Sequence, residues 1–458
     1  MEAMFVAEGA AHAVFRAAGE CGDLFRIQKG RRAAPSPRGD ADLARRAVAY
    51  EAAVAAELLG AAFLPPAVLA PTADAALQTD GLGALMAALR AAYAAQGGDV
   101  EDLAIVAMRV RDATRVWRPL PCGAFLVGSP RVAIEIKPKA ADGARSWCIE
   151  GRFAELKARA SRLDIVRAAA EHSKTTGGAA SSYSNGGVAA ASKHRLSSSR
   201  HHAGSAFFSG DLAVLEAAVR GLVDDGTNGL CRGFLDGVQI ADVAVLAGHS
   251  RAVAAILHRE PLLANLRAAQ RNFDCLDVDG VAFILALDGD AKEPEGMTDW
   301  AAMDWEAYWA EVLATPPSVV SAMHACAAPA GALSKASAAE RDARREAAHA
   351  ALQALAPHER RSLLRRWLIS LALDDVSLMV SFAKVSPAVA ERLQTAAGAG
   401  VILVDGVALA YCVAALDVGP KPTFKLKSKA RAEAALCANA AALGARRPAD
   451  GGTPVKAS

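Results

Sequence analysis

Residues 132–139 read VAIEIKPK and carry more structural information than any other stretch of the chain. Apolar and charged side chains alternate there, which is the period of a β-strand with one apolar face. The apolar positions are Val132, Ile134 and Ile136, and the charged positions are Glu135, Lys137 and Lys139. Pro138 removes a backbone donor, so we expect the strand to end near it. The charged face suits a metal-bound nucleotide beside a phosphorylated acceptor, and a plain solvated strand face has the same pattern.

Upstream of this stretch, the chain begins with a second β pattern. Short apolar runs separated by small or polar residues predict three strands joined by tight turns, at residues 5–6, 14–15 and 24–27. Residues 40–60 and 84–95 are rich in alanine and leucine with charges at helical spacing, which predicts two helices packed on that sheet. We therefore expect a first lobe at residues 1–115, an antiparallel sheet with helices.

Downstream, residues 116–445 are expected to form a larger, helix-rich lobe around a central sheet. The patterns predict helices at 211–224, 238–258 and 338–373, and strands at 376–382 and 407–416. Residues 173–204 are mostly Ser, Gly, Ala and His, with too few large apolar side chains to build a core, so we expect a disordered insert. A polar tail follows at 446–458. The predicted fold class is α+β in two lobes, which 458 residues allow.

Composition limits the compartment and the partners. No run of about 18 apolar residues lacks a charge or a proline, so no membrane span is expected. Glu2 and Glu8 stand where a secretory signal needs positive charge. The eight cysteines form no Cys-x-x-Cys pair, which favours reduced thiols and hence a cytoplasmic or nuclear protein. A net charge of +2 argues against nucleic acid as a partner, so any polyanion must meet a local basic cluster.

Three further segments carry charge or small residues in patterns typical of phosphate chemistry. Glu8–His12 contains small residues whose backbone N–H groups could approach a phosphate, although an ordinary hairpin turn looks the same. Asp374 and Asp375 precede an apolar strand, where a solvated turn is the alternative. Lysines fall on one face of any helix formed at the end of the chain, at positions 421, 425 and 429, and most such runs are solvated faces.

Taken together, these segments resemble motifs of the inositol-pentakisphosphate 2-kinase family, both in their residues and in their order along the chain. The family's Glu-Ile-Lys-Pro-Lys hallmark stands intact at 135–139, and its Arg-Ile-Gln-Lys run at 26–29. Its Asp-Cys-Ser strand is similar to 375–382, and its Asp-Leu-x-x-Lys-Pro signature to 417–422. Weaker matches occur at 8–9, 161–163, 207–210 and 232–237. The resemblance covers residues 5 to about 430 and implies a bilobal inositol-polyphosphate-kinase-like fold.

The resemblance also implies roles for individual residues. A phosphate-covering loop would comprise Glu8, Gly9, Ala10, Ala11 and His12, with Arg26 pairing with a phosphate and Asp112 in the hinge that touches adenine. Lys137 would lie between the γ-phosphate and the accepting hydroxyl, Asp375 would orient or deprotonate that hydroxyl, and Asp417 with Glu135 would hold magnesium. The residues around the inositol phosphates would be Arg31, Lys139, Arg162, Asn228, Arg232, Lys421, Lys425 and Lys429.

The chain departs from the family at two places. A helix that usually carries a histidine and a lysine toward the substrate has Val166 and Ala170 at the aligned positions. The mid-region has only His324, Cys326 and His349 as candidate zinc ligands, with no paired cysteines, and a structural zinc needs four ligands. We therefore expect no structural zinc.

The resemblance implies a transferase in phytate biosynthesis, with ATP and Mg²⁺ as cofactors. This kinase would phosphorylate the 2-hydroxyl of inositol 1,3,4,5,6-pentakisphosphate and give inositol hexakisphosphate, and we expect a monomer. The alternative is a non-catalytic inositol-polyphosphate-binding protein with a degenerate kinase fold, in which the changes at Val166 and Ala170 mark lost activity.

Overall fold

The computed structural model describes fourteen stretches of the chain, which contain the sheets and most of the helices. They are residues 3–8, 12–17, 23–29, 47–65, 67–69, 80–96, 103–114, 131–138, 204–224, 231–276, 278–288, 304–326, 337–395 and 400–419. The expected insert, apart from Gly204, and the expected tail lie outside these residues. Among the described helices, none is long and apolar enough to cross a membrane.

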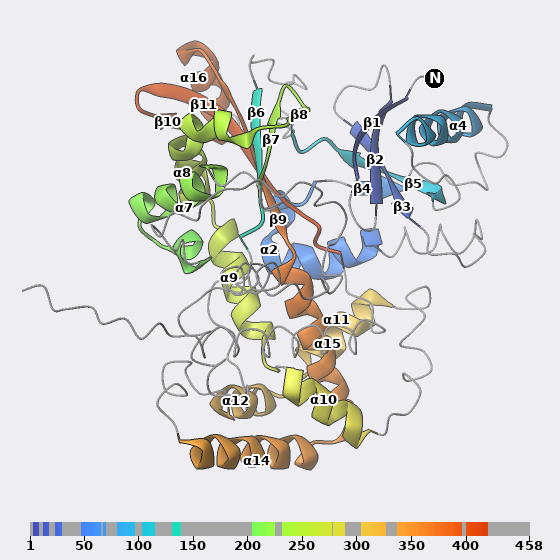
Figure 1. Ribbon diagram of the computed structural model, residues 1–458, viewed down its shortest axis with the longest axis vertical. Coiled ribbons are helices and arrows are strands. Elements are labelled where there is room, and N and C mark those ends of the chain that lie inside the picture. Colours follow the sequence, from blue (N-terminus) through green and yellow to red (C-terminus); the bar gives the residue numbers. More distant parts are fainter. Residues whose placement is uncertain are drawn as a thin grey trace, which may run out of the picture.

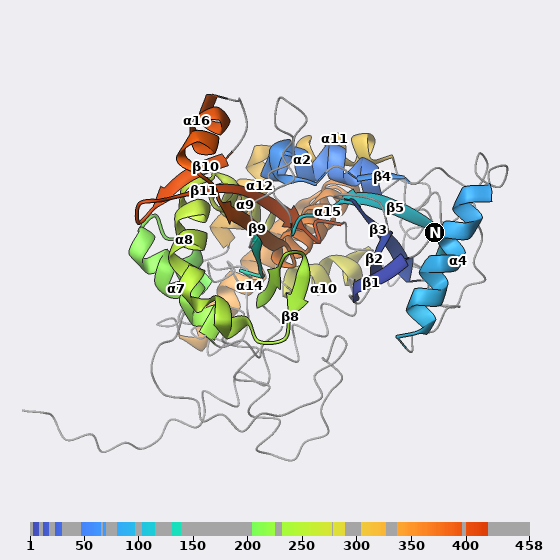
Figure 2. The same ribbon diagram turned by 90° about the horizontal axis from the view of Figure 1, so that it is seen from above.

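A five-stranded antiparallel sheet occupies the N-terminal part of the chain, with strand order β1-β2-β3-β5-β4. Its strands are β1 (Ala3–Glu8), β2 (His12–Ala17), β3 (Asp23–Lys29), β4 (Ala67–Leu69) and β5 (Leu103–Arg111). The three predicted N-terminal strands are thus confirmed. Helix α4 (Asp80–Ala94) packs on β1, on the side away from the rest of the protein (Figures 1 and 2).

A six-stranded antiparallel sheet, in the order β10-β11-β9-β6-β7-β8, forms the centre of the C-terminal part. Its strands are β6 (Arg131–Ile136), β7 (Cys231–Leu235), β8 (Val238–Ile240), β9 (Ser377–Lys384), β10 (Gly400–Val404) and β11 (Val407–Leu416). The strand predicted from VAIEIKPK lies in the interior of this sheet, between β9 and β7. The described part of the chain is therefore α+β, as predicted.

Apart from α4, the described helices lie either before the second sheet, at residues 51–63, or between its strands in the sequence. They are η1 (Glu51–Ala55), α2 (Ala56–Leu59), η2 (Ala61–Phe63), η4 (Gly204–Phe208), α7 (Leu212–Asp224), η5 (Val243–His249), α8 (Ser250–Arg259), α9 (Leu262–Phe273), α10 (Val278–Leu287), α11 (Trp305–Leu313), α12 (Pro317–Cys326), α14 (Ala338–Ala354), α15 (Pro357–Asp374) and α16 (Pro387–Thr395). In Figure 1, α10, α12 and α14 gather at the end of the protein far from both sheets.

Two helix predictions are wrong in detail. The predicted helix at 238–258 is instead strand β8, then η5 and α8, because Asp236-Gly237 makes a two-residue hairpin turn and returns the chain to β7. The predicted helix at 338–373 is two helices, since Pro357 starts α15 as its first residue and cannot continue α14.

One face of the second sheet is buried under helices. Its apolar side chains, such as Ile134, Val380 and Val413, join one large core with residues of α7, α8 and α9. The segment around Val54 and Leu59 belongs to the same core, because η1 and α2 pack against α11 and α9. The prediction that helix 40–60 packs on the N-terminal sheet is therefore wrong.

The opposite face of the second sheet is buried as well. Ala133, Phe234, Met379 and Cys412 form a smaller cluster there, and Ala113 from the segment after β5 packs into it. Glu135 has the same strand parity as Ala133 and is only 6% exposed. The interpretation of this charged face as a plain solvated face is thus wrong for Glu135.

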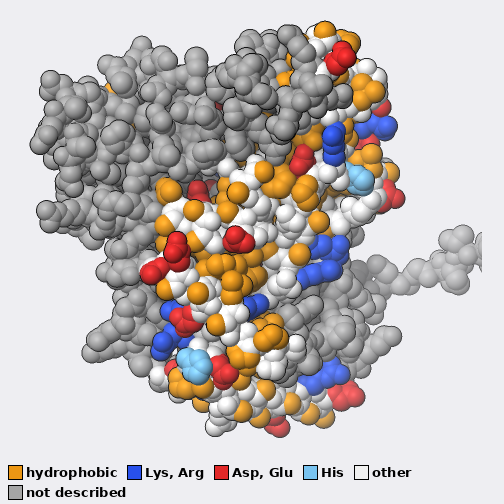
Figure 3. All heavy atoms as spheres, turned by 180° about the vertical axis from the view of Figure 1, so that it is seen from behind, with side chains coloured by type: hydrophobic (Ala, Val, Ile, Leu, Met, Phe, Trp, Pro, Cys, Tyr) orange, Lys and Arg blue, Asp and Glu red, His pale blue; other side chains and the backbone are white. Residues whose placement is uncertain are grey.

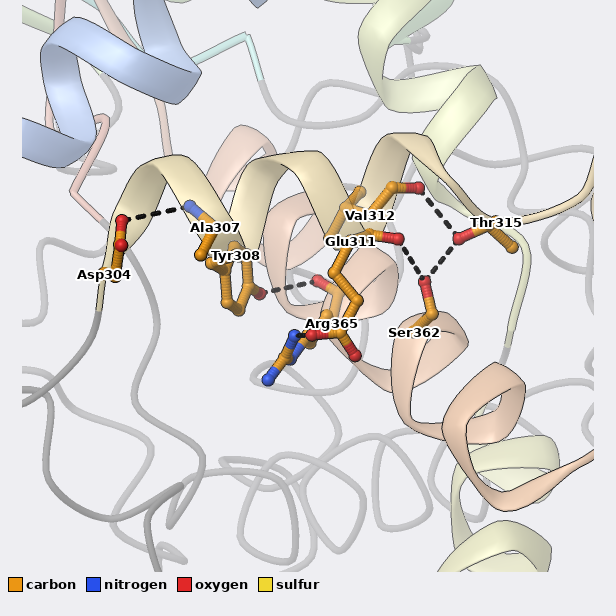
Figure 4. A network of polar contacts seen from close by, with 8 residues as sticks. All are labelled: Asp304, Ala307, Tyr308, Glu311, Val312, Thr315, Ser362 and Arg365. Atoms are coloured by element: carbon orange, nitrogen blue, oxygen red, sulfur yellow. Dashed lines mark hydrogen bonds and ion pairs between the residues drawn. The ribbon is translucent and has the colours of Figure 1, made fainter.

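Helix α15 is held along its length, which matters because it ends next to Asp375. In its first half, the hydroxyl of Tyr308 on α11 donates to the carbonyl of Arg365 at 3.1 Å, and the hydroxyl of Ser362 donates to the carbonyl of Glu311 at 3.3 Å (Figure 4). At its C-terminal end, the buried amide of Gln270 on α9 donates to the carbonyl of Leu373 at 3.2 Å. The end of α15 therefore has a defined position over the sheet.

Gly400, the first residue of β10, lies directly opposite Tyr411 in β11. A Cβ at this position would lie 2.7 Å from the Cζ atom of Tyr411, whose buried hydroxyl donates to Glu260 at 2.7 Å. Because that ring is held at its far end, we expect Gly400→Ala to destabilise the protein by about 1–3 kcal/mol and lower the thermal midpoint. Gly248→Ala is the matched control, since a Cβ at Gly248 meets nothing within 4 Å. Equal midpoints for both variants would contradict the steric argument.

Candidate functional site

Several predicted site residues lie outside the described residues: Gly9, Ala10, Ala11, Arg31, Lys139, Arg162, Asn228, Lys421, Lys425 and Lys429. Val166 and Ala170 do so too. Three more are described by their backbone alone. Glu8 ends β1, His12 begins β2, and Arg26 lies in β3 opposite Met108 of β5. Glu8 and His12 thus lie in paired strands, and the remaining predicted residues lie on the second sheet or on segments attached to it.

Glu135 and Arg232 lie directly opposite each other on β6 and β7. The Nη1 atom of Arg232 is 3.6 Å from the Oε2 atom of Glu135. The arginine is partly exposed and the carboxylate is buried, so the pair directs a guanidinium outward from the sheet face. This contact gives Glu135 an arginine as a partner, a role that differs from the metal ligand expected from the sequence.

Lys137 and Asp417 are 280 residues apart in sequence and meet at the adjoining ends of β6 and β11. The ammonium Nζ of Lys137 donates to Oδ2 of Asp417 at 3.3 Å. The side chains are 24% and 47% exposed, respectively, so the pair is open to solvent and contributes little to stability. The ion pair instead fixes position, because it holds Lys137 and Asp417, which are predicted to contact the γ-phosphate and magnesium, one hydrogen bond apart.

Asp417 adopts a backbone conformation that re-aims its side chain. Its φ angle is +58°, in the left-handed region, yet it is followed by Val418 and not by glycine. Along β11 the residues alternate between the two faces, so regular continuation would put Asp417 on the helix-covered face with Ala415. Instead Val418 enters that core, and Asp417 reaches Lys137. The left-handed residue thus exchanges the two faces at the strand end.

Two other aspartates share this conformation, and both have an ordinary reason for it. Asp236 and Asp405 have φ angles of +50° and +49°, and each precedes a glycine in a two-residue hairpin turn. Asp417 sits in no such turn, and a left-handed non-glycine residue costs on the order of 1 kcal/mol. Unexplained backbone strain of this kind gathers at functional sites.

Asp375 lies beside the same strand ends. It is the C-cap of α15, half-buried, and its N–H donates to the carbonyl of Ala372 at 3.1 Å. Two residues later, the hydroxyl of Ser377 donates to Oδ2 of Asp417 at 3.2 Å. That bond brings the chain carrying Asp375 against the chain carrying Asp417. The two late aspartates of the sequence therefore lie on neighbouring segments of the chain.

Asp112 lies in a tight turn just after β5 and is buried. Its Oδ1 atom accepts from the backbone N–H of Thr114 at 3.0 Å, and the hydroxyl of Ser381 on β9 donates to the carbonyl of Ala113. The turn is thus attached to the same sheet face as Glu135. Its described contacts hold the end of the first sheet against the second.

No role was predicted from the sequence for Ser377 and Ser381, although both lie in the stretch 375–382 that resembles the family's Asp-Cys-Ser strand. Both are buried hydroxyls on β9, four residues apart and hence on one face, at a separation of roughly 13 Å along the strand. One binds the turn that follows β5 and the other binds Asp417. Two hydroxyls at this spacing in an otherwise apolar run were the signal that could have found them.

Cys231, next to Arg232, takes no part in polar chemistry at the site. Burial, with a smaller contribution from the Glu135 carboxylate, raises the pKa of its thiol to about 12. The thiol therefore stays neutral at physiological pH and packs with the core.

Among the described residues, no group of three or more His, Cys, Asp or Glu side chains is arranged to hold a metal ion. The absence of a structural zinc remains a prediction. Magnesium needs less from a protein, because it often takes one or two carboxylates and completes its shell with phosphate oxygens and water. The solvent-exposed carboxylate of Asp417, a hard oxygen donor, fits that requirement.

Comparison with known proteins agrees with the motifs. A family model described as inositol-pentakisphosphate 2-kinase matches residues 5–435, which is most of the chain. A search of curated proteins found no match.

Proposed function

The chain belongs to the inositol-pentakisphosphate 2-kinase family, and from that membership we propose that it transfers the γ-phosphoryl group of ATP to the 2-hydroxyl of inositol 1,3,4,5,6-pentakisphosphate. The product is inositol hexakisphosphate, or phytate. The observation that carries the proposal is the meeting of Lys137, Asp417 and the segment of Asp375 at one corner of the second sheet.

Phosphoryl transfer depends mainly on positioning and on neutralising phosphate oxygens, because the transition state is loose and little covalent chemistry falls to the protein. Lys137 supplies a positive charge beside the γ-phosphate, and Asp375 orients or accepts the proton of the attacking hydroxyl. Asp417 would hold magnesium, which would supply further neutralisation of the phosphate oxygens. In the absence of nucleotide, the ion pair between Lys137 and Asp417 holds the two opposite charges next to each other.

The nucleotide is proposed to lie between the turn at Asp112 and the strand end at Asp417, outside the buried cluster on this face of the sheet. The two buried serines of β9 support the two ends of this region, because Ser381 bonds the turn that carries Asp112 and Ser377 bonds Asp417. In this arrangement the hairpin Glu8–His12 and Arg26 cover the phosphates. The protein is then bilobal, with a first lobe at 1–115 and a second at 116–445, although the segment around Val54 and Leu59 packs with the second.

The inositol phosphates are proposed to meet the basic residues named by the resemblance, with Arg232 as the described member. The net charge of only +2 implies that an anion must meet a local basic cluster, and it argues against nucleic acid as a partner. On the face shown in Figure 3, the described Lys and Arg side chains lie in separate groups among acidic and apolar ones, not in one stripe. We further propose a monomer that works in the cytoplasm or the nucleus.

A transfer assay tests the proposal. Purified protein is incubated with γ-labelled ATP, Mg²⁺ and inositol pentakisphosphate, and the ring position of the new phosphate is resolved. We expect label at the 2-position only. Calorimetry with inositol pentakisphosphate runs alongside, because binding without any transfer would favour the non-catalytic binding protein instead.

Glu135→Gln tests which partner the buried carboxylate serves. Because Glu135 holds the partly exposed Arg232, its loss should weaken inositol pentakisphosphate binding by about three- to tenfold. Asp236→Asn is the control, since Asp236 pairs with Arg131 at the far end of β6. Calorimetry measures both affinities. An unchanged acceptor affinity with a raised Mg²⁺ requirement would instead assign Glu135 to the metal.

A further inference from the structure

We propose that Ser377 is a positioning residue that orients the carboxylate of Asp417 toward the metal-bound nucleotide. The inference rests on the proposed function, since it deepens the role of Asp417 in that reaction. Ser377 stands in the stretch that resembles the family's Asp-Cys-Ser motif, but neither that resemblance nor the charge pattern gives its hydroxyl a role.

The hydroxyl of Ser377 has a fixed position in the protein. Ser377 is fully buried, and its backbone is fixed in the sheet opposite Leu416, the last ladder partner of β11. Asp417 comes one residue beyond that last pair. The bond from the Ser377 hydroxyl to Oδ2 therefore connects the carboxylate to the rigid sheet just where the ladder ends.

One carboxylate oxygen of Asp417 accepts hydrogen bonds from two donors that differ in mobility. Both Lys137 and Ser377 donate to Oδ2 of Asp417, at 3.3 and 3.2 Å. Lys137 is partly exposed, has a flexible four-carbon stem, and must move toward the γ-phosphate to act on it. Ser377 has no such freedom, so it is the donor that stays when the nucleotide arrives.

The backbone of Asp417 is strained. Asp417 is held at a φ angle of +58° without a turn that requires it, so its side chain reaches the site only through a backbone state that is costly by itself. A bond to a buried hydroxyl offsets part of that cost and limits rotation of the carboxylate plane. Groups of this kind behind a metal ligand typically change metal affinity by about 10- to 100-fold when removed.

The test measures metal binding directly. Mn²⁺ serves as a paramagnetic probe, titrated in the presence of a non-hydrolysable ATP analogue and followed by electron paramagnetic resonance. We expect Ser377→Ala to raise the Kd for Mn²⁺ by about tenfold or more. Ser250→Ala is the control, because it removes another fully buried serine hydroxyl, next to His249, whose ring packs on Phe382 at the other end of β9 from Ser377. It should leave the Kd within about twofold of the parent.

A double-mutant comparison separates orientation from general damage. In the Asp417→Asn background, Ser377→Ala should produce no further rise in the Kd, because the group that it orients has already lost its charge. Ser377→Cys keeps the buried volume with a weaker donor and should behave like the alanine variant. It carries the test if thermal melting finds the alanine variant unfolded.

The inference is overturned if Ser377→Ala or, in its place, Ser377→Cys binds Mn²⁺ as tightly as the parent. It is also overturned if the loss is equally large in the Asp417→Asn background. Failure of the proposed function gives a different result, in which the parent binds Mn²⁺ and nucleotide, and the serine dependence holds, but no phosphoryl group reaches inositol pentakisphosphate.

Discussion

The Asp417→Asn variant should lose about a thousandfold in kcat and bind inositol pentakisphosphate nearly as tightly as the parent. Asparagine keeps the side chain's size but removes the charge that magnesium seeks in an oxygen ligand. A metal in this setting contributes several kcal/mol of charge stabilisation, and each 1.36 kcal/mol changes the rate tenfold. Asparagine also tolerates the left-handed region, so the φ angle of +58° is no obstacle to folding.

Asp405→Asn is the matched control for this experiment. Asp405 lies just before the other end of β11, also has a left-handed backbone, and pairs with Arg251 at 3.0 Å far from Lys137. Its variant should turn over at the parent rate. Lys421→Ala should have the opposite phenotype to Asp417→Asn, with acceptor binding weakened by about 10- to 100-fold. A turnover assay beside calorimetry distinguishes them, and parent-like turnover of Asp417→Asn would remove the metal assignment.

Asp375→Asn should lower kcat by about 10²- to 10⁴-fold, the range expected for removal of a general base. The reason is local: Asp375 caps α15, which Gln270 holds at Leu373, and it stands two residues before the serine that contacts Asp417. The backbone of Asp375 is thus held next to the strand end that carries Asp417. Single-turnover kinetics at saturating ATP measures the chemical step itself.

The neighbouring Asp374→Asn is the control, because Asp374 is the last residue of α15 and the two carboxylates differ by one position. It should keep the parent kcat to within about threefold. If Asp374→Asn is the inactive variant and Asp375→Asn is active, the alignment with the family's Asp-Cys-Ser motif is displaced by one residue. Equal losses in both would indicate damage to the end of α15.

Local patterns in the sequence predicted the strands that build the site. Alternation at 132–136 predicted β6, and the apolar runs at 376–382 and 407–416 predicted β9 and β11, the latter to the residue. These predictions were correct because a two-residue period depends only on neighbours along the chain. The family membership came in the same way, from motif wording, and the family model confirmed it.

Contacts between distant residues could not be predicted in that way. Helix propensity identified the segment around Val54 but not the sheet that it packs against, since several apolar surfaces were available. The partner of Glu135 depends on the register between β6 and β7, because Arg232 lies 97 residues further along the chain. A register is a property of two strands, so one strand's pattern does not contain it.

The sequence by itself determined which residues carry the charge at the site and which strands they lie on, because side-chain chemistry and strand period are both local. Only the tertiary structure decided how Asp417 is used. The alternation of side chains along β11 predicts that Asp417 points into the helix-covered core. The left-handed backbone of Asp417 instead turns its carboxylate to Lys137 and Ser377. A reversal of this kind costs energy locally and is stabilised by contacts from residues 40 and 280 positions away, so no local pattern records it.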